Sequence, residues 1–355
     1  MWGVGRVSSV NIPRTQREFG ATVMTRLSVV VPCYNEQESI PELWRRVTQV
    51  SKQVVGDDYE IVLVDDGSRD RTWPLIQQFA EKDGHVVCVR LSRNHGHQLA
   101  LSAGLMVCSG ERILVIDADL QDPPELLPDM MDMIDSGADV VYGQRATRSG
   151  ETWFKRVTAR IFYRVLDHMV EVSIPLDTGD FRLMTRRVLD ALNAMPEHYR
   201  FVRGMVSWLG FRQEPLIYDR QERFAGVTKY PLSKMVRFGI DAITSFSIKP
   251  LRIASALGAI FGVLGIAGLF YSLVSWLQGS VVPGWTSVIV TVLIMGSVQL
   301  FVIGVFGEYL GRLYIESKQR PLFIIDQIVR NKARVCDDPD ILDQVTATSD
   351  VVCTR

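Results

Sequence analysis

The chain has 355 residues, with 39 Lys and Arg against 40 Asp and Glu, and its formal net charge is −1. This balance gives no overall positive field, so we expect no nucleic-acid partner. Hydrophobic residues make up 47% and charged residues 22%, a composition that excludes a disordered chain. The five cysteines form no C-x-x-C pair, so neither a zinc site nor a disulfide framework is predicted.

Residues 1–26 contain scattered arginines and no apolar run, so we predict a disordered leader there rather than a cleaved signal peptide. From residue 27 onward, apolar runs rich in Val, Ile and Leu alternate with amphipathic stretches. The predicted strands are Leu27–Val31, Ile61–Val64, Val86–Leu91 and Ile113–Ile116, with helices near 37–54, 71–82 and 96–108. This alternation indicates an α/β fold with a doubly wound, mostly parallel sheet that is buried on both faces.

Acidic residues follow three of these strands. Glu36 comes after the first, Asp66 follows the second, and Asp117 and Asp119 follow the fourth. Ligands of parallel sheets bind beyond the carboxyl ends of the strands, so we expect these acids to share one binding edge. No G-x-G-x-x-G or P-loop segment follows any of these strands, which counts against dinucleotide binding and P-loop chemistry.

The D-x-D segment Asp117-Ala118-Asp119 indicates a metal site. Alternation along an extended chain would point both carboxylates in the same direction. Mg²⁺ and Mn²⁺ prefer carboxylate and phosphate oxygens, and a cation bridging to a diphosphate would neutralise charge on a nucleotide leaving group. We therefore predict a divalent cation, Mg²⁺ or Mn²⁺, at Asp117 and Asp119, with Gln121 as a further ligand.

Residues 253–307 contain no Asp, Glu, Lys, Arg or His. One membrane crossing needs about 20 apolar residues in a helix, and a turn-like stretch divides this run near its middle. We predict a two-helix transmembrane hairpin over residues 252–310, with helices near 252–277 and 285–309. The alternative is a buried hairpin in the core of a soluble protein.

The segments that flank the hairpin complete the organisation. Residues 231–251 are apolar at helical spacing and predict an amphipathic interfacial helix. Its apolar side could lie at the membrane surface or pack equally well against the α/β domain. Residues 311–355 are predicted to form a tail. Lys and Arg lie at both ends of the hairpin and are absent from its central loop, so the positive-inside rule predicts a multi-pass inner-membrane protein with its α/β domain and both termini in the cytoplasm.

Residues 27–230 resemble glycosyltransferase family 2, and in particular the polyprenyl-phosphate sugar transferases, a group that includes dolichyl-phosphate mannose synthase and the bacterial undecaprenyl-phosphate glucosyl transferases. The segments that carry the resemblance are Val31-Pro32-Cys33-Tyr34-Asn35-Glu36, Val64-Asp65-Asp66-Gly67-Ser68, Arg93-Asn94-His95-Gly96, Asp117-Ala118-Asp119-Leu120-Gln121-Asp122-Pro123-Pro124, Gly143-Gln144-Arg145, Thr178-Gly179-Asp180-Phe181-Arg182 and Arg223-Phe224-Ala225-Gly226-Val227-Thr228-Lys229-Tyr230. The C-terminal hairpin resembles that of the bacterial membrane-anchored subgroup.

The resemblance implies a cytoplasmic glycosyltransferase domain of the A type over residues 27–230. It implies inverting transfer of a hexose, with glucose from UDP-glucose as the leading candidate, to polyprenyl (undecaprenyl) phosphate, and assembly as a homotetramer. The nucleoside end would be bound by Pro32, Tyr34, Glu36, Val64 and Asp66, the diphosphate and metal by Asp117, Ala118, Asp119 and Gln121, and the phosphates also by Arg145, Arg223 and Lys229.

Asp119 and Asp180 are the implied catalytic residues, and Asp180 matches the position of a base in the bacterial subgroup. An acceptor phosphate is already ionised near pH 7, so Asp180 could instead orient the acceptor or Arg182, or cap a turn. His95 and His97 have no second His or Cys at a metal-binding spacing, and we interpret both as loop residues.

Several alternatives stay open from the sequence. Mannosyl or modified-aminosugar transfer would use the same motifs. A processive polysaccharide synthase would carry a Q-x-x-R-W segment, which is absent, and two helices cannot enclose a polymer channel. A non-catalytic membrane scaffold with a transferase-like domain is the alternative from another functional class.

Overall fold

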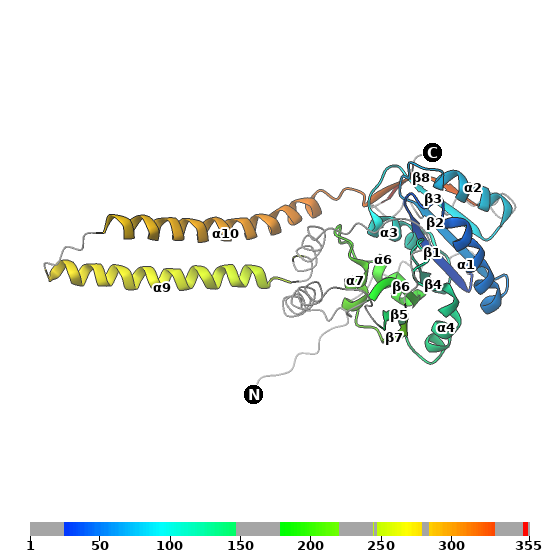
Figure 1. The fold of residues 1–355 in the computed structure, drawn as a ribbon, viewed down its shortest axis with the longest axis horizontal. Coiled ribbons are helices and arrows are strands. Elements are labelled where there is room, and N and C mark those ends of the chain that lie inside the picture. The colour runs from blue at the N-terminus through cyan, green and yellow to red at the C-terminus, as the bar shows by residue number, and fades with distance from the viewer. Residues whose placement is uncertain are drawn as a thin grey trace, which may run out of the picture.

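The protein is described by a computed structural model over residues 25–146, 178–219, 244, 247–278, 284–330 and 351–353. Figure 1 shows an α/β domain from which two long helices, α9 (Lys249–Leu277) and α10 (Trp285–Ser317), project together. The predicted leader, residues 1–26, and the predicted amphipathic helix, residues 231–251, lie largely outside the described residues.

Four parallel strands form the centre of the sheet, in the order β4-β1-β2-β3. Their bounds are β1 (Leu27–Cys33), β2 (Tyr59–Asp65), β3 (Val86–Leu91) and β4 (Arg112–Val115). Every residue of β1 and β2 is buried, as expected for Val- and Ile-rich strands covered on both faces. The predicted strands are therefore confirmed, with small shifts at their ends.

Helices cover both faces of this sheet. One layer comprises α1 (Ile40–Val55), α2 (Thr72–Lys82) and α4 (Leu127–Asp135), and the other comprises α3 (His97–Val107), α6 (Arg186–Asn193) and α7 (Val202–Trp208). Because side chains alternate along a strand, Val29 and Val31 of β1 pack in the first layer and Val30 packs in the second. The prediction of a doubly wound sheet is confirmed.

Antiparallel strands extend the sheet on both sides of the parallel centre. The added strands are β5 (Val140–Arg145), β6 (Thr178–Thr185), β7 (Gln213–Tyr218), β8 (Phe323–Val329) and β9 (Val351–Cys353). β6 runs antiparallel to β4 and β5, and β8 runs antiparallel to β3, whereas β5 pairs parallel with β7. The sheet is thus mostly parallel, as predicted, but mixed.

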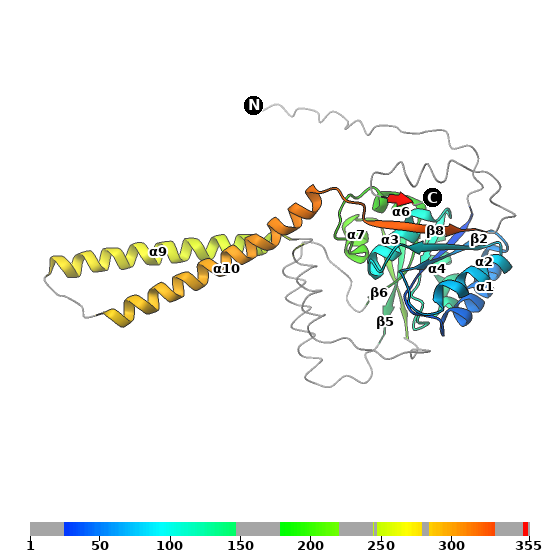
Figure 2. The same ribbon diagram turned by 90° about the horizontal axis from the view of Figure 1, so that it is seen from above.

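β8 changes the interpretation of the predicted tail, residues 311–355. α10 continues to Ser317, and the chain then re-enters the sheet beside β3, where Phe323 and Ile325 are fully buried. Figure 2 shows β8 near α3, and Phe323 and Ile325 share a core layer with the buried side chains of that helix. The α/β domain therefore includes residues that follow the hairpin in sequence.

The two long helices expose their apolar side chains. Ile266 is 70% and Leu300 is 72% exposed. By length and composition two helices could cross a membrane, Lys249–Ser275 with mean hydropathy 2.2 and Ile294–Ser317 with mean hydropathy 1.4, and at most 6% of either span is buried. A core hairpin of a soluble protein would be mostly buried, so that alternative fails for these residues.

His198 fastens the end of α10 to the α/β domain. Its backbone N–H donates to Glu316 Oε1 at 2.9 Å, its Nδ1 lies 2.7 Å from Glu316 Oε2, and its Nε2 lies 2.7 Å from the Arg320 carbonyl oxygen. Beside it, the Arg312 guanidinium lies 4.3 Å from the centre of the Tyr199 ring. Both ring nitrogens of His198 therefore lie within hydrogen-bonding distance of oxygen atoms at the end of α10 and just beyond it.

Replacement of His198 by Ala should loosen this attachment. Loss of hydrogen bonds to a charged partner costs about 1–3 kcal/mol, so amide hydrogen exchange near Glu316 and Arg320 should accelerate by about 5- to 150-fold. Hydrogen-exchange mass spectrometry of the full chain in detergent measures this. Arg187→Ala, which removes an exposed ion pair with Asp139, is the matched control, and equal exchange in both variants would contradict the assigned role of His198.

Candidate functional site

The loops after β1 and β2 hold one another at the carboxyl edge of the sheet. The backbone N–H of Asn35 donates to Ser68 Oγ at 3.0 Å, and the Asn35 side-chain oxygen accepts from the Arg69 N–H at 2.8 Å. Asn35 has φ of +56°, a left-handed conformation that Asn tolerates well. A side chain at Gly67 would lie 2.7 Å from the Arg93 backbone, so glycine allows the third loop to approach the second.

The predicted nucleoside-binding residues lie at or below this edge. Tyr34 is 42% exposed, whereas Pro32 and Val64 are buried opposite one another in the β1–β2 register. The Val64 side chain packs in the core under α3, so only its backbone is directed along the edge. Glu36 accepts a hydrogen bond from Ser39 Oγ at 2.7 Å.

Asp66 organises the third loop. Its two carboxylate oxygens accept from the backbone N–H groups of His95 at 2.7 Å and Gly96 at 2.9 Å. Burial raises the pKa of the Asp66 carboxyl, and the two N–H groups oppose that rise. Through these two hydrogen bonds, Asp66 fixes the conformation of the loop that leads into α3.

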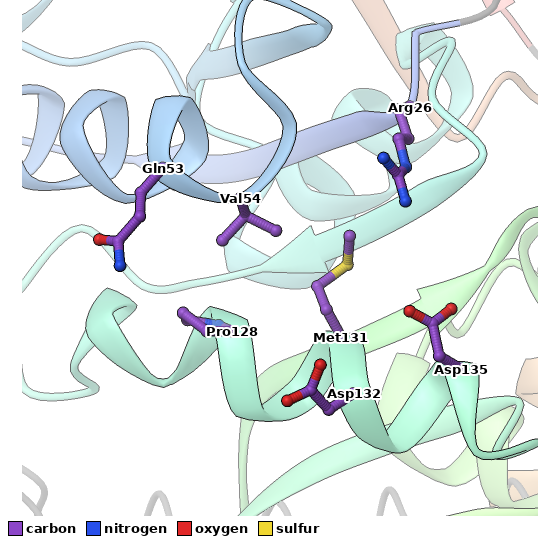
Figure 3. Close-up of a pocket in the computed structure, with 7 residues that line it drawn as sticks. All are labelled: Arg26, Gln53, Val54, Pro128, Met131, Asp132 and Asp135. Carbon is purple, nitrogen blue, oxygen red and sulfur yellow. The ribbon is translucent and has the colours of Figure 1, made fainter.

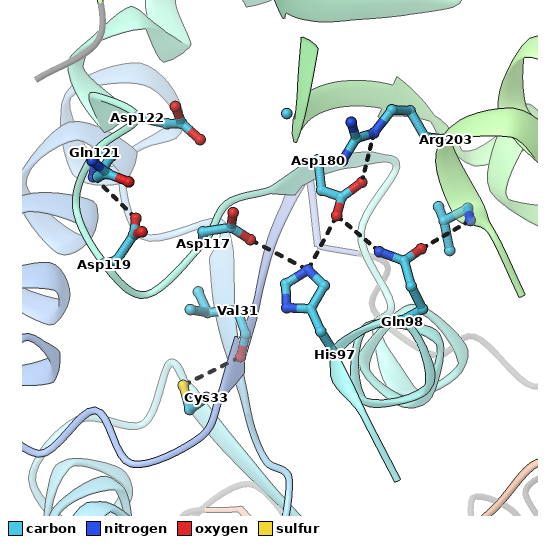
Figure 4. Close-up of polar contacts among 12 residues, drawn as sticks. Val31, Cys33, His97, Gln98, Asp117, Asp119, Gln121, Asp122, Asp180 and Arg203 are labelled. Atoms are coloured by element: carbon cyan, nitrogen blue, oxygen red, sulfur yellow. Dashed lines mark hydrogen bonds and ion pairs between the residues drawn. The ribbon is translucent and has the colours of Figure 1, made fainter. Parts of the chain in front are cut away.

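The D-x-D segment lies beyond β4, because that strand ends at Val115. Asp117 and Asp119 are therefore loop residues, and the alternation rule for strands does not set their directions. Figure 4 shows Asp117 pointing towards His97 and Asp119 lying beside Gln121, whose N–H donates to Asp119 Oδ1 at 3.2 Å. The structure brings the three predicted metal ligands to one loop, with Asp117 directed to one side of it.

Asp117 lies in a concentrated negative field. Burial raises the pKa of its carboxyl to about 6, His97 opposes the rise, and the charges of Asp180, Asp122 and Asp119 add to it. Asp117 Oδ1 is buried without a hydrogen-bond partner among the described residues. This oxygen lies 3.5 Å from His97 Nε2, an ion pair longer than a hydrogen bond. A carboxylate oxygen without a hydrogen bond, surrounded by other carboxylates, suits a divalent cation, which would relieve the repulsion and supply the missing contact.

Arg145 and Asp122 form the next part of the edge. The Arg145 Nη2 lies 4.0 Å from Asp122 Oδ1, which also accepts a hydrogen bond from the Tyr218 hydroxyl. Burial and the charge of Asp122 raise the pKa of Tyr218 well above its usual range. A side chain at Gly179 would lie 3.1 Å from Arg145 Nη2, so this glycine leaves room for the guanidinium.

Asp180, on β6, is buried among hydrogen-bond donors. Its Oδ2 accepts from His97 Nε2 at 3.1 Å and Gln98 Nε2 at 2.9 Å, and its Oδ1 accepts from Arg203 Nε at 3.3 Å. Burial alone would favour the neutral acid, but Arg203, His97 and Arg182 hold the pKa of Asp180 well below its usual range. A carboxylate in this state is a weak base and a strong anchor for its partners.

His97 belongs to this site, contrary to its interpretation from sequence. The ligand atoms of His97, Asp117 and Asp180 all lie within 4.8 Å of one another, and among the described residues they form a potential metal-binding group that does not include Asp119. Partial burial would lower the pKa of His97, but the hydrogen bond to Asp180 and the charge of Asp117 raise it to about 9.

Sequence reasoning missed His97, Gln98 and Arg203, because no motif spacing links them to Asp180. His97 and Asp180 are 83 positions apart, and only the pairing of β4 with β6 brings them together. The one available signal was the position of His97 and Gln98 directly after a motif at a strand end. Of the predicted phosphate-binding residues, Arg145 is at the site, whereas Arg223 and Lys229 lie outside the described residues.

A separate cavity lies at the opposite edge of the sheet. It has a volume of about 220 Å³ and is lined by Arg26, Gln53, Val54, Pro128, Met131, Asp132 and Asp135 (Figure 3). Arg26 directly precedes β1, so this cavity lies at the amino ends of the parallel strands. It contains none of the predicted site residues.

Comparison with known proteins links the site to chemistry. Residues 28–192 match the family described as Glycosyl transferase family 2, and residues 249–313 match the GtrB C-terminal hairpin. The uncharacterized glycosyltransferase YkcC of Bacillus subtilis is 46% identical over 301 residues, covering 84% of this chain and 93% of the relative.

Two further relatives carry more specific names. The prophage bactoprenol glucosyl transferase homolog of Escherichia coli is 39% identical, covering 85% of this chain and 99% of the relative. The bactoprenol glucosyl transferase of Shigella phage SfV is 38% identical, covering 84% of this chain and 98% of the relative. These alignments extend through both the α/β domain and the hairpin.

The Asp180→Asn variant should lower the pKa of His97 from about 9 towards its ordinary value of about 6.5, because the amide removes a negative charge that favours the imidazolium. Histidine NMR titration of the metal-free protein in detergent measures the change. Asp190→Asn, which changes an exposed carboxylate of α6, should leave the pKa of His97 unchanged. Equal pKa values in the wild-type and Asp180→Asn proteins would contradict the electrostatic assignment.

Proposed function

Because this chain belongs to the family 2 glycosyltransferases, we propose that it transfers glucose from UDP-glucose to polyprenyl (undecaprenyl) phosphate with inversion. The product would be a lipid-linked glucose donor at the cytoplasmic leaflet of the inner membrane. Relatives named as bactoprenol glucosyl transferases and the matching hairpin support this substrate class.

The acidic edge beyond β4 and β6 is the observation that carries the proposal. It gathers Asp117, Asp119, Asp122 and Asp180 beside Arg145 and His97. The donor set of Asp117, Asp119 and Gln121 would hold Mg²⁺ or Mn²⁺, and the Asp117 oxygen that has no hydrogen bond among the described residues fits such a cation. When bound, the cation supplies positive charge to a diphosphate leaving group.

The nucleoside and diphosphate would lie along this edge. Tyr34, Glu36 and Asp66, with the backbone at Pro32 and Val64, are the candidates for the nucleoside end. Arg145 would turn from Asp122 to the diphosphate, because a guanidinium can contact two phosphate oxygens at once. Arg223 and Lys229, which lie outside the described residues, are proposed to contact the negatively charged phosphates as well.

The acceptor phosphate itself would act as the nucleophile. One of its oxygens forms a bond to the anomeric carbon as the bond from that carbon to the diphosphate breaks, and UDP leaves. A phosphate monoester is largely dianionic at pH 7 because its second pKa is about 6, so the acceptor needs no strong base. Asp180, whose pKa is held low, is suited to orient His97 and Arg203 rather than to accept a proton.

The hairpin would keep the α/β domain at the membrane surface. Lys249 and Arg252 begin α9, while Arg312, Lys318 and Arg320 follow the apolar part of α10. The positive-inside rule then supports a cytoplasmic α/β domain. Anchoring raises the effective concentration of a lipid acceptor at the site. A homotetramer built through the hairpin stays part of this proposal.

Transfer of radiolabel into an organic-soluble lipid tests the function. Full-length protein in membranes with undecaprenyl phosphate should convert UDP-[¹⁴C]glucose to an extractable glucolipid, and should do so faster than with GDP-mannose or a UDP-aminosugar. A faster reaction with one of these donors would replace glucose as the sugar. Only water-soluble polymer would indicate a processive synthase, and no product from any donor would indicate a scaffold.

Asp119→Ala should reduce transfer by at least about 100-fold, because loss of a metal ligand removes several kcal/mol of transition-state stabilisation. Asp132→Ala, in the cavity at the opposite edge of the sheet, is the control and should retain wild-type activity. Chelation with EDTA should abolish transfer, and Mg²⁺ or Mn²⁺ should restore it. Full activity of Asp119→Ala would remove the metal assignment.

A further inference from the structure

His97 lies between two carboxylates that come from different strands. Its Nε2 is 3.1 Å from Asp180 Oδ2, on β6, and 3.5 Å from Asp117 Oδ1, beyond β4. The first contact is a hydrogen bond and the second is an ion pair longer than a hydrogen bond. Figure 4 shows the imidazole directed at both carboxylates from the start of α3.

The backbone that carries His97 is fixed independently of these contacts. Gly96 has φ of +97°, which glycine tolerates, and both Gly96 and His95 donate backbone N–H groups to Asp66. The N–H groups of Leu99 and Ala100 donate to the Gly96 carbonyl oxygen at 3.0 Å. The His97 imidazole therefore extends from a backbone turn that is fixed by hydrogen bonds.

The two carboxylates differ in how they are held. Asp180 is anchored by Gln98 at 2.9 Å and Arg203 at 3.3 Å in addition to His97. Asp117 Oδ1, in contrast, has no hydrogen-bond partner among the described residues, and His97 is the cation within 3.5 Å of it. His97 thus connects a carboxylate oxygen that has no hydrogen bond to a carboxylate that has several.

We infer that His97 is a positioning residue that orients Asp117 for a divalent cation by linking it to the anchored Asp180. This inference rests on the metal site of the proposed function and adds a residue that no family motif in the sequence identifies. Groups that orient metal ligands tune affinity strongly, because a misdirected carboxylate must first pay the cost of reorientation before it binds.

Mn²⁺ binding without substrates tests the inference. Electron paramagnetic resonance of the full-length protein in detergent should give a dissociation constant for Mn²⁺ that rises by about 10- to 100-fold in His97→Ala. His97→Gln keeps an N–H donor but not the charge, and charged donors are about twice as strong as neutral ones. Its dissociation constant should therefore lie between those of the wild-type and His97→Ala proteins.

A distant histidine provides the matched control. His85 lies at the amino edge of the sheet, where its Nδ1 is 2.7 Å from Asp83 Oδ1 and its ring stacks on Tyr59. His85→Gln should leave the dissociation constant unchanged. An unchanged constant in His97→Ala, or no Mn²⁺ binding by the wild-type protein, would overturn the inference.

Spectroscopy separates positioning from direct ligation. Electron spin-echo modulation of bound Mn²⁺ should lack the ¹⁴N coupling of a coordinated imidazole, and such a coupling that disappears in His97→Ala would overturn the positioning role. In transfer assays, His97→Ala should raise the metal concentration for half-activation by the same factor and leave the KM for the lipid unchanged.

The two proposals fail in different ways. If the wild-type protein makes glucolipid and binds Mn²⁺ but His97→Ala binds it equally well, only the inference fails. If no nucleotide sugar gives a lipid product although Mn²⁺ binding depends on His97, the proposed function fails and the positioning role stands.

Discussion

Crowding of carboxylates at the carboxyl edge of the sheet is the constraint on which this molecule depends. Burial disfavours the ionised form of Asp117, and the negative charges of Asp180, Asp122 and Asp119 disfavour it further. Like charges gathered in a partly buried site are stable only with compensation. The fold supplies part of it through fixed cations around Asp180 and leaves Asp117 incompletely satisfied. That imbalance distinguishes this edge from a closed ion-pair network.

The carboxylates of this edge differ in how fully their oxygens are hydrogen-bonded within the protein. Asp66 accepts one backbone N–H on each carboxylate oxygen and sets the path of the loop into α3. Asp180 is saturated by side chains of α3 and α7. Saturated carboxylates cannot easily exchange partners, since each lost hydrogen bond leaves a buried charge unpaired. In the D-x-D loop, by contrast, Asp117 Oδ1 has no hydrogen bond among the described residues.

The hairpin is tied to this domain at its returning end. α10 continues past its apolar part, contacts His198 through Glu316, and leads into β8 beside β3. A strand of the sheet thus follows the apolar hairpin in sequence, and the domain can complete its sheet only after the hairpin has been made. Pairing of β8 with β3 gives the hairpin a defined connection to the sheet.

The sequence by itself determined the parallel centre of the sheet, the apolar hairpin and the D-x-D loop, because each is written in a local pattern of hydrophobicity or in a short motif. Tertiary structure alone decided that β8 joins the sheet, and that His97, Asp117 and Asp180 meet. His97 and Asp180 stand 83 positions apart, and nothing in either segment encodes the other. Their contact arises from strand pairing and from the path of one loop held by Asp66, which are properties of the whole folded chain.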